Sequence, residues 1–434
     1  MTTSQSRKQA WKWVPSLYFA EGLPYIVVMS VSVIMYKRLG VSNTDIAFYT
    51  SWLYLPWVIK PFWSPLVDIL KTKRTWIITM QLLLGAGFAG VALTLPTTNF
   101  FRYSLAFLWL VAFSSATHDI AIDGFYMLGL SKHNQAWFIG IRNTAYRFAM
   151  IFGQGLLIIF AGFLETSNLK ESGNIPFAWM ITFFVLTGLF ILFFLYHNFV
   201  LPKPEKDRTK KELTFTLFSK EFLQTFVLFF RKKQIVIIIL FILLYRLAEG
   251  QLAKIAAPFL LDTRVAGGLA LTTTQVGFAY GTVGIIALIL GGLLGGFVSA
   301  KHGLKYWIWW MLAAINLPDL VYVFLSYTQT TNLIVVNLAI AIEQFGYGFG
   351  FTAFLLYLIY ISEGNYKTAH YAIATGLMAL GMMIPGMLSG WLQELIGYRE
   401  FFIWVCISTI PIFIITIFLK IDPEFGKKIE TGQI

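Results

Sequence analysis

The feature that most limits the fold of this chain is a succession of long apolar runs. Crossing the hydrocarbon core of a bilayer as a helix takes about 20 apolar residues. Twelve segments qualify, at residues 13–36, 46–69, 75–96, 101–127, 136–164, 176–200, 234–261, 272–300, 304–327, 332–360, 369–396 and 400–420. We therefore expect an all-α membrane protein, because helices satisfy their own backbone hydrogen bonds within lipid.

Composition agrees with a chain whose solvent is the lipid bilayer. The sequence is 57% hydrophobic and only 12% charged, whereas soluble domains carry about 25% charged residues. The net charge of +12 would suit a nucleic-acid partner, but the basic residues cluster in short links between apolar runs. We expect no nucleic-acid partner. The single cysteine, Cys406, excludes a disulfide framework and a cysteine-based zinc cluster, and we expect neither a metal nor a cofactor.

The distribution of Lys and Arg predicts the orientation in the membrane. With the N-terminus inside, 22 of the 33 basic residues lie in inner links, six in outer links and five within spans. Basic residues favour the cytoplasmic side, so we expect both termini in the cytoplasm. The first apolar run is too long for a signal peptide and lacks a small-residue cleavage site, so we expect it to stay as the first span.

The longest polar segment divides the predicted spans six and six. We predict an N-terminal six-helix bundle at 1–200, a cytoplasmic linker at 201–233 and a C-terminal six-helix bundle at 234–434. Five phenylalanines in the linker recur at three- and four-residue intervals: Phe215, Phe218, Phe222, Phe226 and Phe229. They predict an amphipathic helix at the inner membrane surface, or alternatively a partner-binding helix. The plan resembles the major facilitator superfamily, whose substrate site lies between two parallel repeats.

Ionisable residues within the spans are functional candidates, because each costs roughly 3 kcal/mol or more at the bilayer centre unless it is paired or hydrated. The acidic ones are Glu21, Asp119, Asp123, Glu249, Asp319 and Glu343, and the basic ones are Lys60, Arg142, Arg147, Arg246 and Lys254. We interpret Glu21, Asp119, Asp123, Glu249 and Glu343 as candidates for proton coupling.

The fourth span places Asp119 and Asp123 four residues apart, hence on one helical face. Two close carboxylates repel each other, so one of them could take up and release a proton. Arg142 and Arg147 in the fifth span are possible partners, and a structural Asp–Arg clamp is the alternative. We interpret His118 as a packing or hydrogen-bonding residue rather than a proton carrier.

The seventh and tenth spans carry the other paired candidates. Arg246 and Glu249 are three residues apart and can pair on one face, either as neutralisation within one helix or as a pair lining a cavity. Glu343 and Gln344 precede three glycines that permit close helix packing or local bending: Gly346, Gly348 and Gly350. Glu21 has a predicted kink beside it at Gly22 and Pro24.

Several residues are candidates for binding the cargo or gating its path. Lys60, Arg147 and Arg246 could meet an anionic group, Gln344 could bind a polar one, and the aromatic rings of Tyr25 and Tyr146 could stack on a sugar. Asp68 lies in SPLVDILKTKR, residues 64–74, which resembles the basic inner-loop motif of the superfamily. We interpret Asp68 as part of an inner gate, together with Arg142 and His118 as gate or structural candidates.

Seven stretches, taken in order and spacing, resemble the AmpG-type muropeptide permeases and the related acetyl-CoA transporters. They are FAEGLPY (19–25), KPFWSPLVD (60–68), SSATHDIAID (114–123), RNTAYRFAM (142–150), PFLLD (258–262), IEQFGYGFGFTAF (342–354) and GMLSGWLQELIGYREFF (386–402). The resemblance implies proton-driven import of anhydro-muramyl cell-wall fragments across a bacterial cytoplasmic membrane. It strengthens Asp119, Asp123, Arg147, Glu249 and Glu343 as candidates.

Two departures from that family leave the cargo open. His118 stands where the bacterial permeases often have Gln, and the best-known members carry two further helices. A plain sugar, an oligosaccharide or a peptide-free fragment is therefore possible. We expect a monomeric symporter driven by the proton-motive force, with a small sugar or sugar-peptide and protons as its partners. The rival hypotheses are exchange of acetyl-CoA, and a non-transporting membrane enzyme or sensor. No P-loop, GxSxG or HExxH motif supports a catalytic site.

Overall fold

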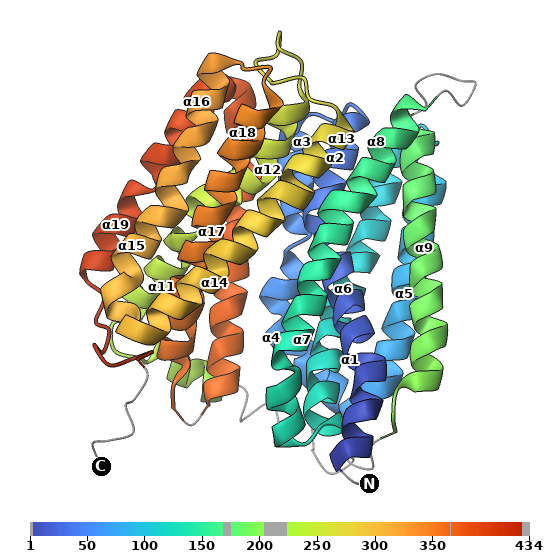
Figure 1. Ribbon diagram of the computed structural model, residues 1–434, viewed down its shortest axis with the longest axis vertical. Coiled ribbons are helices and arrows are strands. Elements are labelled where there is room, and N and C mark those ends of the chain that lie inside the picture. The colour runs from blue at the N-terminus through green and yellow to red at the C-terminus, as the bar shows by residue number, and fades with distance from the viewer. Residues whose placement is uncertain (1–2, 168–174, 204–223, 365, 428–434) are drawn as a thin grey trace. The chain divides into compact units, whose positions relative to one another are not determined.

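A computed structural model describes residues 3–167, 175–203, 224–364 and 366–427, and within these ranges the chain is helical with no strand (Figure 1). The helices form two compact units. The first unit comprises Met1–Val41, Ile59–Phe218 and Thr272–Gly277, and the second comprises Ser42–Val58, Ser219–Leu271 and Phe278–Ile434. The predicted domain boundary at 201–233 stays a prediction. Most of its amphipathic stripe lies outside the described residues, and residues 224–230 are helical.

The first unit begins with α1 (Thr3–Ile26), which continues through a π-helical turn (Val27–Val31) into α2 (Ser32–Arg38). Its other helices are α4 (Leu55–Leu70, from Ile59 onward), α5 (Lys73–Thr94), α6 (Phe100–Gly129), α7 (Lys132–Met150), the π-helical segment Ile151–Leu157, α8 (Ile158–Thr166), α9 (Ile175–Val200) and most of α13 (Thr273–Phe278). Helix α1 packs against α7, and α5 packs against α6 and α9. Trp13, Tyr18 and Phe125 are buried in the core.

The second unit contains α3 (Asn43–Trp52), α11 (Ile235–Tyr245), α12 (Leu247–Leu261), the π-helical segment Ala279–Gly284, α14 (Ile285–His302), α15 (Leu304–Asn316), the 3-10 turn Leu317–Asp319, α16 (Leu320–Thr328), α17 (Leu333–Ser362), α18 (Lys367–Ser408) and α19 (Ile410–Ile417). Helix α17 packs against α14 and α15, while α18 packs against α3 and α12. Phe241, Tyr245 and Phe354 stand in its apolar core.

Ten helical segments of the described residues are long and apolar enough to cross a membrane, so the protein is a multi-pass membrane protein. The count of twelve and the cytoplasmic termini stay predictions. The predicted eleventh and twelfth spans form one segment of 49 residues, Ala369–Ile417. Its backbone leaves the helical conformation at Gly397, where φ is +82°, a value that glycine tolerates because it has no Cβ.

The prediction of one continuous second span at 46–69 is wrong. A turn at Leu53 and Tyr54 separates α3 from α4. The physical reason is Pro56, which donates no backbone hydrogen bond and disfavours a helical conformation at the residue before it. The seventh span is also interrupted, because Arg246 has φ −110° and ψ 18° between α11 and α12.

The three glycines of the tenth span bring α17 close to its two neighbours. A Cβ on Gly348 would lie 2.1 Å from the Leu288 carbonyl oxygen of α14, and one on Gly346 would lie 2.1 Å from the Ala314 carbonyl oxygen of α15. Only hydrogen fits at these positions. This confirms the prediction of close packing, and it fixes the height at which α17 presents Glu343 and Tyr347.

Candidate functional site

The first charged cluster consists of Glu21, Lys60, Asp119, Asp123 and Arg142, which four helices of the first unit (α1, α4, α6 and α7) bring together. The Lys60 ammonium donates a hydrogen bond to Asp119 Oδ2. Arg142 Nη2 lies 3.3 Å from Asp123 Oδ1. Each aspartate of α6 therefore has its own cation, one from α4 and one from α7.

Two tyrosines hold the guanidinium of Arg142, and the sequence analysis missed both. The Tyr18 hydroxyl donates to Asp123 Oδ1 at 3.3 Å. The Arg142 guanidinium lies 4.6 Å from the centre of the Tyr18 ring and 5.3 Å from that of Tyr126, within the range of a cation–π interaction. Tyr18 could have been found from its position three residues before Glu21, which places both on one face of α1.

Glu21 is the remaining carboxylate of this cluster. Its Oε2 atom is buried and has no hydrogen-bond partner among the described residues. It interacts electrostatically with Asp119, Asp123, Arg142 and Lys60. The cluster thus contains three carboxylates and two cations. Because Lys60 pairs with Asp119 and Arg142 pairs with Asp123, Glu21 is the carboxylate without a paired cation. An unneutralised carboxylate at this depth is costly.

The second charged cluster lies in the second unit, at the interruption of the seventh span. Arg246 donates two hydrogen bonds to Glu249, and the one from Nε to Oε2 measures 2.6 Å. Arg246 Nη2 also donates to the Tyr347 hydroxyl at 3.1 Å, and its guanidinium lies 5.0 Å from the centre of the Phe351 ring. The predicted pair forms, and α17 supports it with two aromatic rings.

A further group of carboxylates in this unit, Glu343 and Asp319, forms no ion pair with a cation among the described residues. Glu343 accepts hydrogen bonds from Gln344 Nε2 at 2.8 Å and from the Tyr322 hydroxyl at 3.5 Å. The Tyr322 hydroxyl also bonds that of Tyr280. Asp319, in the 3-10 turn before α16, is buried and within electrostatic range of Glu343 and Glu249. The sequence analysis counted Asp319 as an intramembrane acid but gave it no role; Pro318 before it is the signal for the helix break.

The other predicted residues occupy separate positions. His118 is buried and bonds Gln81, whose side chain also bonds His197, an arrangement that suits a hydrogen-bonding histidine. Arg147, in the last turn of α7, has a buried Nη1 without a hydrogen-bond partner among the described residues, and the contact between an aspartate of α6 and an arginine of α7 is made by Arg142. The side chain of Asp68 lies outside the described part of the chain.

The aromatic candidates of the first unit flank Glu21. A Cβ on Gly22 would lie 3.0 Å from the Tyr146 ring, so α7 passes close to α1 beside Glu21. Tyr25 follows Glu21 by one helical turn on α1. The roles of both rings in binding the cargo stay predictions.

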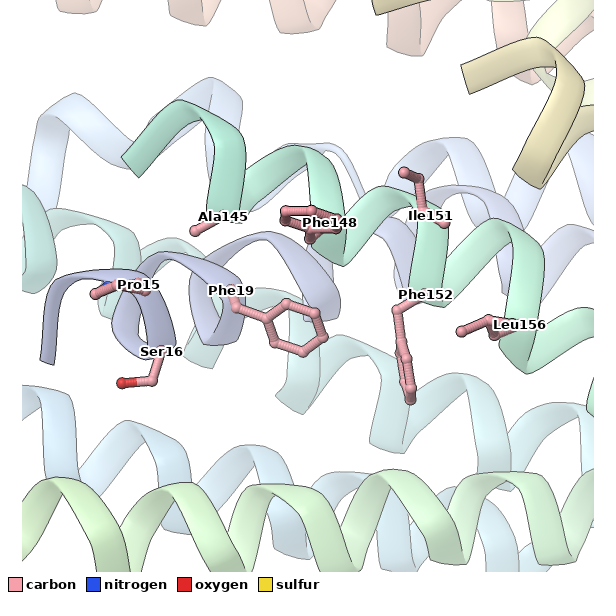
Figure 2. A pocket seen from close by; sticks show the side chains of 8 residues that line it. All are labelled: Pro15, Ser16, Phe19, Ala145, Phe148, Ile151, Phe152 and Leu156. Atoms are coloured by element: carbon pink, nitrogen blue, oxygen red, sulfur yellow. The ribbon is translucent and has the colours of Figure 1, made fainter. Parts of the chain in front are cut away.

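A surface pocket of about 460 Å³ lies on the first unit between α1, α7 and the π-helical segment after it (Figure 2). Seven of its lining side chains are apolar: Pro15, Phe19, Ala145, Phe148, Ile151, Phe152 and Leu156; Ser16 is the polar one. A sugar needs several hydrogen-bonding groups, which this pocket does not offer. In the described part of the chain, no group of three or more His, Cys, Asp or Glu residues could hold a metal ion.

Long apolar helices with ion pairs inside them define a multi-pass membrane protein of the transporter class. The family model described as the Major Facilitator Superfamily matches residues 16–365. The chain belongs to this superfamily of transporters.

Known proteins resemble the chain over most of its length. The "Putative transporter AmpG 4" of Rickettsia conorii is 24% identical over 417 residues, which cover 93% of this chain and 95% of that protein. The "Anhydromuropeptide permease" of Escherichia coli K12 is 24% identical over 424 residues, covering 95% of this chain and 80% of the permease.

Solved structures show the same fold. A D-xylose-proton symporter gives a TM-score of 0.70 at 12% identity and covers 97% of this chain and 99% of its own. The nucleoside transporter NupG gives 0.66 at 14% identity, covering 97% and 100%.

Proposed function

We propose that this protein is a proton-coupled symporter that imports anhydro-muropeptides or peptide-free anhydro-muramyl sugars across a bacterial cytoplasmic membrane by alternating access. The similarity to the anhydromuropeptide permease supports the cargo class. The observation that carries the proton coupling is the first charged cluster, in which Glu21, Asp119 and Asp123 share the cations Lys60 and Arg142.

The cluster supports a simple sequence of charge states. With Glu21 ionised, the cluster carries one negative charge in excess, and this charge opposes any movement that removes water from it. A proton on Glu21 makes the cluster neutral, while the pairs Lys60–Asp119 and Arg142–Asp123 keep the two aspartates ionised and in place. Proton binding thereby lowers the cost of the conformational change that carries the cargo across.

The second charged cluster is better suited to bind the cargo. Arg246 is held by Glu249 and Tyr347, so its guanidinium is oriented and can exchange one of these bonds for a hydroxyl or carboxylate of the cargo. Gln344 bonds Glu343 and could contact an N-acetyl group. We propose that Tyr25, Tyr146 and Arg147 of the first unit add stacking and hydrogen-bonding contacts. No cofactor is required beyond the proton-motive force, and a monomer is sufficient.

Uptake into proteoliposomes tests this proposal. Wild-type protein should accumulate labelled N-acetylglucosaminyl-anhydro-N-acetylmuramic acid when a proton gradient is imposed, and excess N-acetylglucosamine or chitobiose should not compete. Asp119→Asn and Asp123→Asn, which each leave a cation unpaired, should abolish accumulation. Accumulation of acetyl-CoA or of simple N-acetylated sugars in place of the anhydro-disaccharide would reject the cargo, and unchanged accumulation in both variants would reject the role of the cluster.

A further inference from the structure

Lys254 is a buried cation of the second unit that belongs to neither of the two charged clusters. It lies in α12 with only 1% of its surface exposed, and its Nζ has no hydrogen-bond partner among the described residues. A buried ammonium without a counter-charge is costly. Lys60, Arg142 and Arg246 each pair with a carboxylate of their own chain, whereas Lys254 forms no such pair within the ranges that the structure describes.

The surroundings of Lys254 supply further polar groups, and no ion pair with an acid forms there in the described part of the chain. Its Nζ lies 5.2 Å from the centre of the Tyr54 ring. The Ser51 hydroxyl is also buried without a hydrogen-bond partner among the described residues. Ser51 and Lys254 both lie beside Gly386 of α18, because a Cβ on that glycine would lie 2.6 Å from Ser51 Oγ and 3.4 Å from Lys254 Cγ. Two unsatisfied donors therefore stand around one glycine.

Of the three helices that meet at this point, α3 ends here, and α12 and α18 each contain a proline. Tyr54 lies in the turn between α3 and α4. Pro258 in α12 cannot donate to the carbonyl of Lys254, four residues earlier, and Pro385 in α18 leaves the Gly381 carbonyl without its helical partner. Proline positions are where helices bend, and binding sites of membrane transporters are typically built from discontinuous helices. The helices that enclose Lys254 can therefore bend next to it and expose its ammonium group.

We infer that Lys254 and Ser51 form a binding site for a carboxylate, with the Lys254 ammonium as its counter-charge and the Ser51 hydroxyl as a second donor. Because no carboxylate of the described residues forms an ion pair with Lys254, this place is left for an anion from outside. That the anion belongs to the cargo rests on the proposed function, because anhydro-N-acetylmuramic acid carries a lactyl carboxylate.

The site itself is tested without transport, on the purified full-length protein in detergent. The melting temperature is measured against D-lactate and against the neutral lactamide at constant ionic strength. Lactate alone should raise it in the wild type and in Lys301→Met, which removes an exposed lysine of α14. Lys254→Met should show no lactate-dependent rise, and Lys254→Arg should keep part of it. An equal rise in Lys254→Met, or none in the wild type, overturns the inference.

Transport then tests whether the cargo uses the site. For the wild type, the anhydro-disaccharide should have a KM at least roughly tenfold lower than its carboxamide, since hydrogen bonds to charged groups are the strong ones. Lys254→Met should raise the KM of the acid to that of the amide and leave the amide unchanged. An equal loss for both substrates would show a structural role and overturn the assignment. If lactate binds but neither disaccharide is transported, the proposed function fails and the anion site stands.

Discussion

The contact between α14 and α17 gives the sharpest structural prediction. A Cβ on Gly348 would lie 2.1 Å from the Leu288 carbonyl oxygen and 3.0 Å from the Gly292 nitrogen, both of them backbone atoms that no side-chain rotation can move. Gly291 makes the reciprocal contact, with the Phe345 carbonyl oxygen 2.1 Å from its own ideal Cβ position. Gly348→Ala therefore has to separate the two helices by roughly 1 Å, which loses van der Waals contact along them.

The size of the effect follows from two opposing contributions. Replacing Gly by Ala in a helix stabilises it by about 1 kcal/mol, whereas overpacking typically costs about 1–3 kcal/mol and sometimes more. Because the clash is with backbone on both sides, we expect a net destabilisation of roughly 2 kcal/mol. Transport should fall as well, because the shift of α17 displaces the neighbouring Tyr347 hydroxyl from Arg246.

Thermal unfolding in detergent, followed by the loss of the monomeric peak in size-exclusion chromatography, measures this prediction. Gly296→Ala is the matched control, because the same substitution in α14 meets no atom within 4 Å. The control should be at least as stable as the wild type, and Gly348→Ala clearly less stable. Equal melting temperatures for the two variants would refute the assigned packing of α17.

Three further predictions concern the charges. Lys60→Met and Asp119→Asn should each abolish gradient-driven uptake. The exchange Lys60→Asp with Asp119→Lys should recover a measurable part of the uptake, and a double variant without any uptake would contradict the pairing. Removing Arg246 or Glu249 alone should destabilise the protein more than removing both, because one partner alone leaves a buried charge unpaired; additive losses of melting temperature would argue against the pair. Glu343→Gln should lower the affinity for cargo, because Gln344 and the Tyr322 hydroxyl lose the charged acceptor of their hydrogen bonds, and an unchanged KM would argue against this role.

Much of the fold could be predicted because apolar length is a strong signal. The ends of α6, Phe100 and Gly129, lie close to the predicted span 101–127. The break in the second span escaped prediction because the run from 46 to 69 is predominantly apolar, and hydropathy does not register the missing donor at Pro56. The predicted end of the eleventh span at residue 396 lies next to Gly397, where the backbone leaves the helical conformation.

The candidate site was predictable where partners lie on one helix. Arg246 and Glu249 are three residues apart, and helical periodicity alone brings them together. Lys60 and Asp119 lie 59 residues apart, and only the packing of α4 against α6 decides that they meet. Periodicity likewise could not choose between Arg142 and Arg147 as the partner of Asp123. Lys254 gave no signal beyond its depth, because the lack of an ion-pair partner within the described ranges depends on every helix around it.

The most direct test of proton coupling is the flux of protons that accompanies the cargo in proteoliposomes containing the Glu21→Gln variant. Import of one proton together with one monoanionic disaccharide moves no net charge, so the pH gradient alone drives it. A gradient of one pH unit should therefore give about tenfold accumulation in the wild type. The outer medium should become more alkaline at the same time. Glu21→Gln should exchange labelled for unlabelled cargo yet show neither accumulation nor a pH change, while Glu424→Gln, at an exposed ion pair, behaves as the wild type. Wild-type accumulation and proton flux in Glu21→Gln would contradict the assignment of Glu21 as the proton-binding carboxylate.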